Sequence, residues 1–487
     1  MIDQPVSRVW WRALTAVAVV YLGTEKVSAM NLNLACPWSD TCSPPQTPYL
    51  TFHSPQSENL LFVSGDTIEL RCQSGLRSVG LRWTLHRNMI LKPFRAGEAE
   101  ALPANRFRIR LGTEGLPPGF YDVKVELDTG LSNDAKDSLA KRPVRGVCTF
   151  GWKASLMAVA ETRPDDFKKF WDEAKAKLAA IPLDAREGPL LVFGPKEING
   201  YNVTNACLPP DYDPANHRAE KVESCKVDFA GPDGGRVYGW LAKPVGLGKF
   251  PAMLVLPGAG FAARPRPLEH ARHGYMALDI QVHGQDVDLT SYPKLPGYYA
   301  DFKYDPPSAY YYFNVHLRCI QAVNYLASRP DVDASRIVVV GGSQGGRLSV
   351  VVAGLDPRIR AAVPCIAHSS NQPHLRWVER CNGRAAAGGA GDGMDVPGAP
   401  PVTDDAESRG FAYYDPMNYA TDIRCPVLFN AGLIDPVSPP TSVWAAFNRV
   451  GSADKTMVAL DGLGHDWSAE FDRRAWRWLD ARIFNPK

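Results

Sequence analysis

Short apolar runs separated by Gly and Pro fill the first part of the chain, between about residues 48 and 152. Thr67 to Cys72 reads T-I-E-L-R-C, which is the alternation of a strand with one buried face. β-Branched and aromatic residues dominate the other runs in the same way. The pattern predicts strands at Asn59–Val63, Thr67–Cys72, Val79–His86, Arg106–Leu111, Phe120–Leu127 and Val144–Phe150.

One corner of this β-region has a recognisable sequence. Pro117-Pro118-Gly119-Phe120-Tyr121 resembles the corner before a late strand of an immunoglobulin-like sandwich. The cysteine usual two residues after that tyrosine is replaced by Val123. We therefore predict a small immunoglobulin-like β-sandwich at residues 48–152 without the common inter-sheet disulfide. A spacer module and a carbohydrate-binding module both remain open, because a fold alone implies no function.

The pattern changes in the second part of the chain, which we assign to residues 160–487. Apolar strands alternate with amphipathic helices there, which predicts an α/β fold with a mostly parallel sheet covered on both faces. A Gly/Ala/Pro-rich stretch at 382–403 is expected to be a mobile surface loop near the top of the sheet. The predicted strands are Val237–Ala242, Ala252–Leu256, Tyr275–Ile280, Ile337–Val340, Ala361–Cys365, Pro426–Asn430 and Met457–Leu460, and the predicted helices start at Pro164 or cover Ser308–Ser328, Arg347–Gly354 and Ala469–Leu479.

The stretch from Ile337 to Gly346 reads I-V-V-V-G-G-S-Q-G-G. A β-branched strand, a G-x-S-x-G turn and a helix in this order form the nucleophile elbow of an α/β-hydrolase. The serine is strained at such a turn, and side chains at Gly341 and Gly345 would clash with the neighbouring strand and helix. We therefore predict that Ser343 is a nucleophile.

Two further residues lie where such a serine needs partners. Asp435 follows the predicted strand Pro426–Asn430, and His465 follows the last predicted strand. The order Ser, Asp, His is that of an α/β-hydrolase, in which the histidine takes the serine proton and the aspartate orients the imidazole. Asp466 is a competing acid, but its adjacency to His465 gives poor geometry. An oxyanion needs two backbone N–H groups, which we assign to Gln344 and to Ala259 or Gly260 in the loop after Leu256.

The other histidines lack such a context, and we expect His283, His316 and His368 to be structural. No cluster has metal-ligand spacing, so the sequence predicts no metal and no cofactor.

Several stretches resemble the acetyl xylan esterase and cephalosporin C deacetylase group, carbohydrate esterase family 7. The resemblance covers about Arg163 to Ile483, and the stretches that carry it are Pro164–Trp171, Tyr310–Val323, Gly341–Gly346 (G-G-S-Q-G-G) and Cys425–Pro440. It implies deacetylation of acetylated xylo-oligosaccharides through an acyl-enzyme. By the same resemblance Ser343 is the nucleophile, Asp435 the acid, His465 the base, and the N–H groups of Gln344 and Ala259 form the oxyanion hole.

The sequence departs from this family at three sites. The family's R-G-Q reads His283-Gly284-Gln285, its H-E reads His465-Asp466, and its Y-x-G-Y reads Leu256-Pro257-Gly258-Ala259. These changes leave acyl and alcohol preference open. The family commonly forms hexamers, and whether the added β-domain permits a homo-oligomer is also open.

The amino terminus bears on location. Arg8 and Arg12 precede the apolar run Ala13–Leu22, and Val27-Ser28-Ala29 fits a small-x-small cleavage rule. We predict a signal peptide at 1–29, a Pro/Ser/Thr-rich linker at 30–47, and a secreted or periplasmic protein without a membrane anchor after cleavage. Ten cysteines fit export, and Cys36–Cys42 and Cys207–Cys225 could close loops.

The net charge of +2 gives no nucleic-acid footprint. Three functions remain: a secreted serine esterase acting on small acetylated carbohydrates, a serine peptidase or other esterase of the same fold, and a non-catalytic glycan-binding relic. A β-region of about 100 residues is too short for the propeller of a prolyl-oligopeptidase. An intact Ser-Asp-His set argues against the relic.

Overall fold

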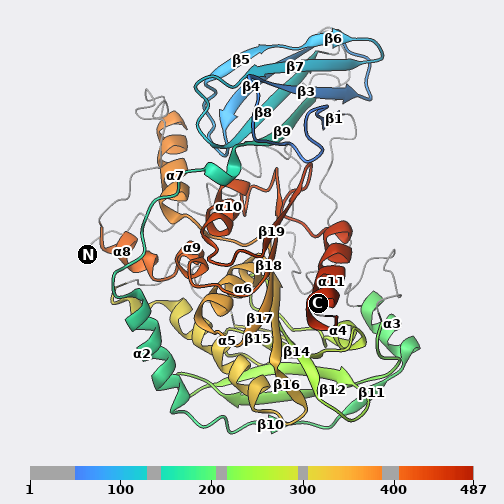
Figure 1. Ribbon diagram of the computed structural model, residues 1–487, viewed down its shortest axis with the longest axis vertical. Helices are drawn as coiled ribbons and strands as arrows, with labels where there is room; N and C mark the ends of the chain where they lie inside the picture. Colours follow the sequence, from blue (N-terminus) through green and yellow to red (C-terminus); the bar gives the residue numbers. More distant parts are fainter. Residues whose placement is uncertain (1–49, 129–143, 205–216, 294–304, 387–404, 486–487) are drawn as a thin grey trace.

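A computed structural model describes residues 50–128, 144–204, 217–293, 305–386 and 405–485. The predicted signal peptide and linker, Cys36, Cys42, Cys207 and most of the 382–403 stretch lie outside these ranges. An all-β domain occupies the upper part of Figure 1, and a larger mixed α/β domain lies below it.

The β-domain consists of two sheets, with strand orders β1-β3-β7-β6 and β2-β9-β8-β4-β5. Ile68, Leu70 and Cys72 alternate as buried residues along β3, as the sequence predicted. Cys72 and Cys148 are buried thiols without a disulfide. The strands are β1 Leu50–His53, β2 Leu61–Phe62, β3 Thr67–Ser74, β4 Gly80–Arg87, β5 Arg95–Glu98, β6 Glu100–Leu102, β7 Arg106–Gly112, β8 Gly119–Asp128 and β9 Val144–Trp152.

The α/β domain is built on a 10-stranded sheet of order β10-β12-β13-β15-β14-β16-β17-β18-β19, in which β11 also pairs with β12. The strands from β15 to β19 are parallel, whereas β12 and β13 pair antiparallel. The strands are β10 Arg186–Glu187, β11 Leu191–Phe193, β12 Val222–Ala230, β13 Arg236–Pro244, β14 Phe250–Leu256, β15 Met276–Gln281, β16 Val332–Gly342, β17 Ile359–Cys365, β18 Val427–Gly432 and β19 Lys455–Leu460.

Helices cover both faces of this sheet (Figure 1). One face packs against α5 and α6, and the other packs against α11. Within the described ranges, no helix has the length and apolarity needed to cross a membrane. The helices are α2 Phe167–Ala179, α3 Pro195–Thr204, α4 Leu268–Arg272, α5 Tyr311–Ser328, α6 Gln344–Leu355, α7 Gln372–Ala386, α8 Ala406–Ala412, α9 Pro416–Ala420, α10 Pro440–Arg449 and α11 Ala469–Ile483, with short 3-10 turns η1 Ala154–Leu156 and η4 Pro307–Ala309.

The start of the predicted 382–403 loop is helical, which corrects the predicted boundary. α7 continues to Ala386. Val378 and Cys381 on this helix pack with Ile90 of the β-domain. Burial against another domain therefore stabilises the part of the helix that leads into this stretch.

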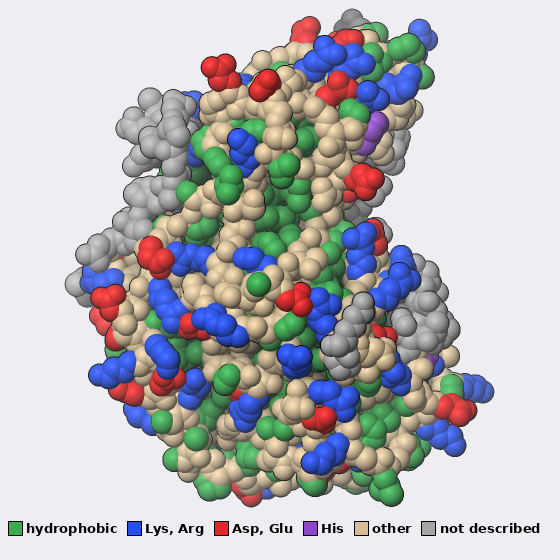
Figure 2. Space-filling view, viewed as in Figure 1, with side chains coloured by type: hydrophobic (Ala, Val, Ile, Leu, Met, Phe, Trp, Pro, Cys, Tyr) green, Lys and Arg blue, Asp and Glu red, His purple; other side chains and the backbone are tan. Residues whose placement is uncertain are grey.

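The β-domain rests on α7 and α10. The rings of Phe120 and Trp444 lie 4.7 Å apart, and Thr441 Oγ1 donates a hydrogen bond to Asn88 Oδ1 at 3.0 Å. The side chain of Asn382 accepts from the Leu91 N–H and donates to the Met89 carbonyl, both at 2.9 Å. On the face in Figure 2, apolar side chains gather where the domains meet, while acidic and basic side chains are mixed elsewhere.

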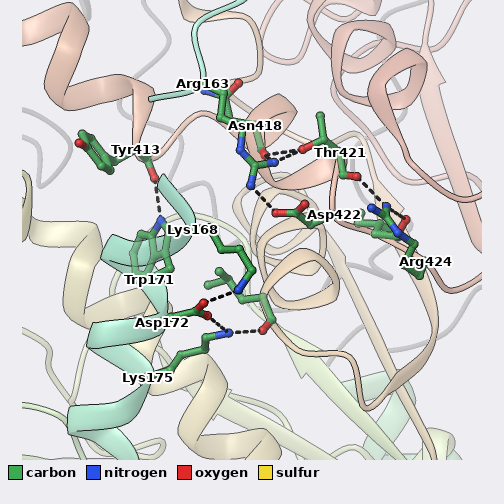
Figure 3. Close-up of polar contacts among 12 residues, drawn as sticks. Arg163, Lys168, Trp171, Asp172, Lys175, Tyr413, Asn418, Thr421, Asp422 and Arg424 are labelled. Carbon is green, nitrogen blue, oxygen red and sulfur yellow. Dashed lines mark hydrogen bonds and ion pairs between the residues drawn. The ribbon is translucent and has the colours of Figure 1, made fainter. Parts of the chain in front are cut away.

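The segment between the domains is anchored where it enters α2 (Figure 3). Arg163 donates to the Asn418 carbonyl at 3.1 Å and pairs with Asp422 at 2.6 Å. One turn after the start of α2 at Phe167, Trp171 Nε1 donates to the Tyr413 carbonyl at 3.3 Å. The helix begins at Phe167 rather than at the predicted Pro164, because residues 165 and 166 form a turn first.

Candidate active site

Ser343 lies at the turn between β16 and α6. Its φ of 57° and ψ of −116° are strained for a residue with a side chain. A Cβ on Gly341 would lie 2.7 Å from the Leu256 carbonyl oxygen, and a Cβ on Gly345 would come closer still. The predicted clash is confirmed: both positions require glycine because the turn presses against β14.

Three side chains from separate loops meet at this turn. His465 Nε2 lies 3.0 Å from Ser343 Oγ, and His465 Nδ1 lies 2.8 Å from Asp435 Oδ2. Asp435 follows β18, and His465 follows β19. The parallel strands β16, β18 and β19 therefore bring the three predicted residues together at their carboxyl ends. A serine hydroxyl, a base and an orienting acid that are hydrogen-bonded in this order can perform nucleophilic acyl transfer.

The environment of Asp435 suits a buried carboxylate. Asp435 is 1% exposed, and its Oδ1 accepts from the N–H groups of Val437 at 2.7 Å and Ser438 at 2.8 Å. Burial alone would lower the pKa of His465, but the charge and hydrogen bond of Asp435 raise it above its ordinary value. Asp466, the competing acid, accepts from the Trp467 N–H at 2.7 Å.

Gln344 follows the serine directly, so its N–H lies at the first turn of α6, where the backbone leaves donors unpaired. Its side chain has a second task that the sequence did not indicate. Nε2 donates to the Gly258 carbonyl at 3.2 Å, and Oε1 accepts from the Tyr312 hydroxyl at 2.8 Å. Ala259 lies next to Gly258 in the partly buried loop after β14. The amide thus holds the elbow and this loop together.

Further along, the same loop is fixed by a buried ion pair. Arg264 donates to both carboxylate oxygens of Asp279, at 2.7 and 3.0 Å. The ring of Phe261 stacks on His283 with 4.3 Å between centroids. His283 Nδ1 bonds the Tyr311 hydroxyl at 2.8 Å, and burial lowers the pKa of His283 to about 3. His283 is therefore a neutral structural residue, and it supports the loop that carries Ala259.

His316 is also buried in the core, where its Nδ1 lies 3.1 Å from the Tyr419 hydroxyl, as expected for a structural histidine. His368, the third of these histidines, links two loops of the site. Its backbone N–H donates to the Ser343 carbonyl at 3.2 Å, and its Nδ1 lies 3.0 Å from the Val437 carbonyl. It therefore joins the turn at Ser343 (the serine turn) to the loop after β18 that carries Asp435 and Val437 (the acid loop). No local pattern in the sequence marks it, because both contacts depend on the adjacency of β16, β17 and β18.

Among the residues that the structure describes, one other cluster offers metal-ligand side chains. Ligand atoms of His217, Glu269 and His273 lie within 4.8 Å of one another. Arg272 donates to His217 Nδ1 at 2.9 Å, so the proton of this imidazole is on Nε2, which bonds Glu269. Asn202 donates to the other Glu269 oxygen at 2.9 Å. These proton positions and the guanidinium charge disfavour a cation, and the residues form a hydrogen-bonded structural network.

Comparison with known proteins identifies the family. The profile of the acetyl xylan esterase (AXE1) family matches residues 196–482, more than half of the 487-residue chain. The chain belongs to the acetyl xylan esterase family. This confirms the resemblance found in the sequence and makes the protein a carboxylic ester hydrolase. Acetyl esterase Axe7A of Xylanibacter ruminicola is 25% identical over 458 residues, covering 90% of this chain and 92% of that protein.

Two solved structures from the acetyl xylan esterase family resemble this chain. An acetyl xylan esterase from Paenibacillus sp. R4 has a TM-score of 0.51 and 28% identity, covering 68% of this chain and 98% of its own. Acetyl xylan esterase 1 from Thermoanaerobacterium sp. JW/SL YS485 has a TM-score of 0.50 and 21% identity, covering 67% of this chain and 96% of its own. Both are esterases, which supports an α/β-hydrolase type of fold. About a third of this chain has no counterpart in either structure.

Proposed function

We propose that this protein is a secreted serine esterase that removes acetyl groups from acetylated xylo-oligosaccharides or similar small acetyl esters. The hydrogen-bonded chain Ser343–His465–Asp435 carries this proposal, because it supplies a nucleophile, a base and an orienting acid in a member of the acetyl xylan esterase family. The names of Axe7A and of the solved esterases support an acetyl ester as substrate. The signal peptide assigned to residues 1–29 supports export.

The proposed chemistry gives each of these groups a task. Ser343 Oγ attacks the acetyl carbonyl carbon while His465 Nε2 accepts its proton. The N–H groups of Gln344 and Ala259 are the proposed donors to the oxyanion. The bond to the sugar oxygen then breaks, as His465 returns the proton to that oxygen and leaves an acetyl-serine. Water attacks this ester by the same route and releases acetate, with Asp435 stabilising the imidazolium in both halves.

The domain assignment belongs to the same proposal: an immunoglobulin-like sandwich at 48–152 and an α/β-hydrolase at 160–487. The strand orders β1-β3-β7-β6 and β2-β9-β8-β4-β5 support the first, since an immunoglobulin-like fold pairs its strands in two such sheets. Tyr121 donates to the Pro117 carbonyl at 2.6 Å, the bond expected of a tyrosine corner.

The test is hydrolysis of p-nitrophenyl acetate and release of acetate from acetylated xylan by the wild type and by Ser343→Ala. We expect the variant to lose roughly 10⁶-fold in kcat, because the remaining groups cannot replace the nucleophile. Ser335→Ala, an exposed serine on the same strand, is the matched control and keeps full activity.

Other outcomes separate the alternatives. Cleavage of a peptide amide with no release of acetate from xylan would favour the serine peptidase. Equal activity of the wild type and Ser343→Ala on both esters would exclude the serine mechanism, and no hydrolysis by either protein would favour the relic.

A further inference from the structure

The position of His368 relative to the sheet decides which part of a substrate it can meet. In the sheet, β14 lies on one side of β16, and β17, β18 and β19 follow on the other. The loop after β14 carries Ala259, so the ester carbonyl oxygen points to that side. The leaving oxygen must face His465, after β19. His368, three residues beyond β17, therefore lies on the side of the alcohol.

The contacts of His368 fix which of its nitrogens carries the proton. A carbonyl only accepts, so the 3.0 Å contact between Nδ1 and the Val437 carbonyl places the proton on Nδ1. Nε2 then carries a lone pair and can only accept. In the described part of the chain, no hydrogen bond to this Nε2 is present.

The side chain of His368 is less enclosed than those of the other two histidines. The Nε2 atoms of His316 and His374 are fully buried, whereas His368 as a residue is only partly buried. Burial, together with the nearby charges of His465 and Arg347, lowers the pKa of His368 to about 4. The ring therefore stays neutral near neutral pH, and Nε2 remains an acceptor.

A hydroxyl beside the ester is the group that such an acceptor would recognise. We propose that His368 Nε2 accepts a hydrogen bond from a free hydroxyl next to the acetylated position of a polyol or sugar, so that the site prefers these acetates to simple alkyl acetates. This inference rests on the proposed esterase function and extends it to the alcohol half of the substrate. A site built to bond a hydroxyl discriminates against an analogue that lacks it.

The experiment compares kcat/KM for 2-hydroxyethyl acetate with kcat/KM for ethyl acetate, which lacks the neighbouring hydroxyl. In His368→Asn the amide nitrogen can keep the bond to the Val437 carbonyl, but nothing reaches the place of Nε2. In His368→Gln an acceptor reaches that place while the bond to Val437 is lost. His368→Phe, which keeps the ring volume without nitrogen, replaces the asparagine variant should that variant not fold.

We expect the ratio of the two kcat/KM values to fall about tenfold in His368→Asn, with ethyl acetate changed less than about threefold, and to recover at least partly in His368→Gln. An unchanged ratio in His368→Asn overturns the proposal. An equal loss on both substrates overturns it too, because His368 would then only position the acid loop.

The assignment of acetylated xylan as substrate is tested independently of the role of His368. If the wild type hydrolyses both small acetates and releases no acetate from acetylated xylan, the xylan assignment is wrong, while the ratio still decides the role of His368.

Discussion

Asp435 controls both the orientation and the charge of His465. It accepts from Nδ1 of the imidazole and from two backbone N–H groups, so its carboxylate has a single well-defined position. Its charge raises the pKa of His465 against the effect of burial. The pH profile of the enzyme should therefore report this contact directly.

In the proposed mechanism catalysis needs neutral His465, and a raised pKa retains the proton to higher pH. We expect kcat/KM to be full above this pKa and to fall as the pH drops through it, with a midpoint above about 6.5. Asp435→Asn removes the charge, so the midpoint should move to lower pH while kcat falls about 10⁴-fold. Rates on p-nitrophenyl acetate between pH 5 and 9 measure both effects. A midpoint unchanged by the substitution would mean that protonation of another group causes the loss of activity at low pH.

Among the site residues, those that directly follow a strongly apolar strand could be predicted from the sequence. Ser343, Asp435 and His465 each follow an apolar run, so the parallel sheet that those runs predict also predicts their meeting. His368 follows such a run as well, but its role depends on the Val437 carbonyl, 69 positions away. Contacts to backbone carbonyls across a sheet leave no trace in the residue types, which explains why the sequence did not indicate that His368 links the two loops.

Among the elements, the loop after β14 depends most on distant support. Gln344 holds it through Gly258 and is itself held by Tyr312. Arg264 and Asp279 fix its further end. An oxyanion hole works because its donors are already in place before reaction. Because the loop carries the proposed donor Ala259, its rigidity should appear in kcat rather than in KM.

Gln344→Leu keeps the proposed N–H donor and removes both side-chain bonds. We expect kcat to fall about 10- to 100-fold, less than the roughly 10²–10³-fold loss of a whole oxyanion donor, with KM nearly unchanged. Tyr312→Phe removes only one of the two bonds and should give a smaller loss. Steady-state kinetics on p-nitrophenyl acetate measure the difference. A rise in KM alone would place the amide in substrate binding instead.

The elements themselves were predicted where hydrophobic patterns are strong. β3, β7 and β8 alternate clearly and were located within two residues of their ends. The short strands β5 and β6 read R-A-G-E and E-A-L and carry no such alternation. They form because neighbouring strands offer free edges, which is a tertiary effect. The helical start of the 382–403 stretch has the same kind of origin, because the preceding turn of α7 packs against Ile90 and Asn382 bonds two backbone groups of the β-domain.

For the whole molecule, the two domains form one packed unit. Asn382 bonds two backbone groups of the β-domain, and Trp444 packs on Phe120. Asn448 donates to the Ala154 carbonyl at 2.9 Å near the far end of α10. The β-domain and the short turn η1 that follows it therefore contact α10 at both ends and support the helix that directly follows the loop of Asp435.

Asn382→Ala tests this support. The substitution leaves the Met89 carbonyl and the Leu91 N–H without their partner, and we expect it to lower the free energy of unfolding by about 1–3 kcal/mol. Arg380→Ala, an exposed residue on the same helix, should change it by less than about 0.5 kcal/mol. Urea unfolding followed by tryptophan fluorescence compares them. Equal stability of both variants would mean that the two Asn382 hydrogen bonds contribute nothing to the packing of the β-domain on the α/β domain.

The contact between Asn88 and Thr441 joins positions 353 residues apart, so it sets an order of events during synthesis. The β-domain leaves the ribosome first and can fold as a unit, while β18, α10 and β19 emerge last. These late elements carry Asp435 and His465, and they complete the sheet against a surface that already exists. A destabilising substitution in the β-domain should therefore reduce the yield of folded enzyme, while each molecule that does fold keeps its turnover rate.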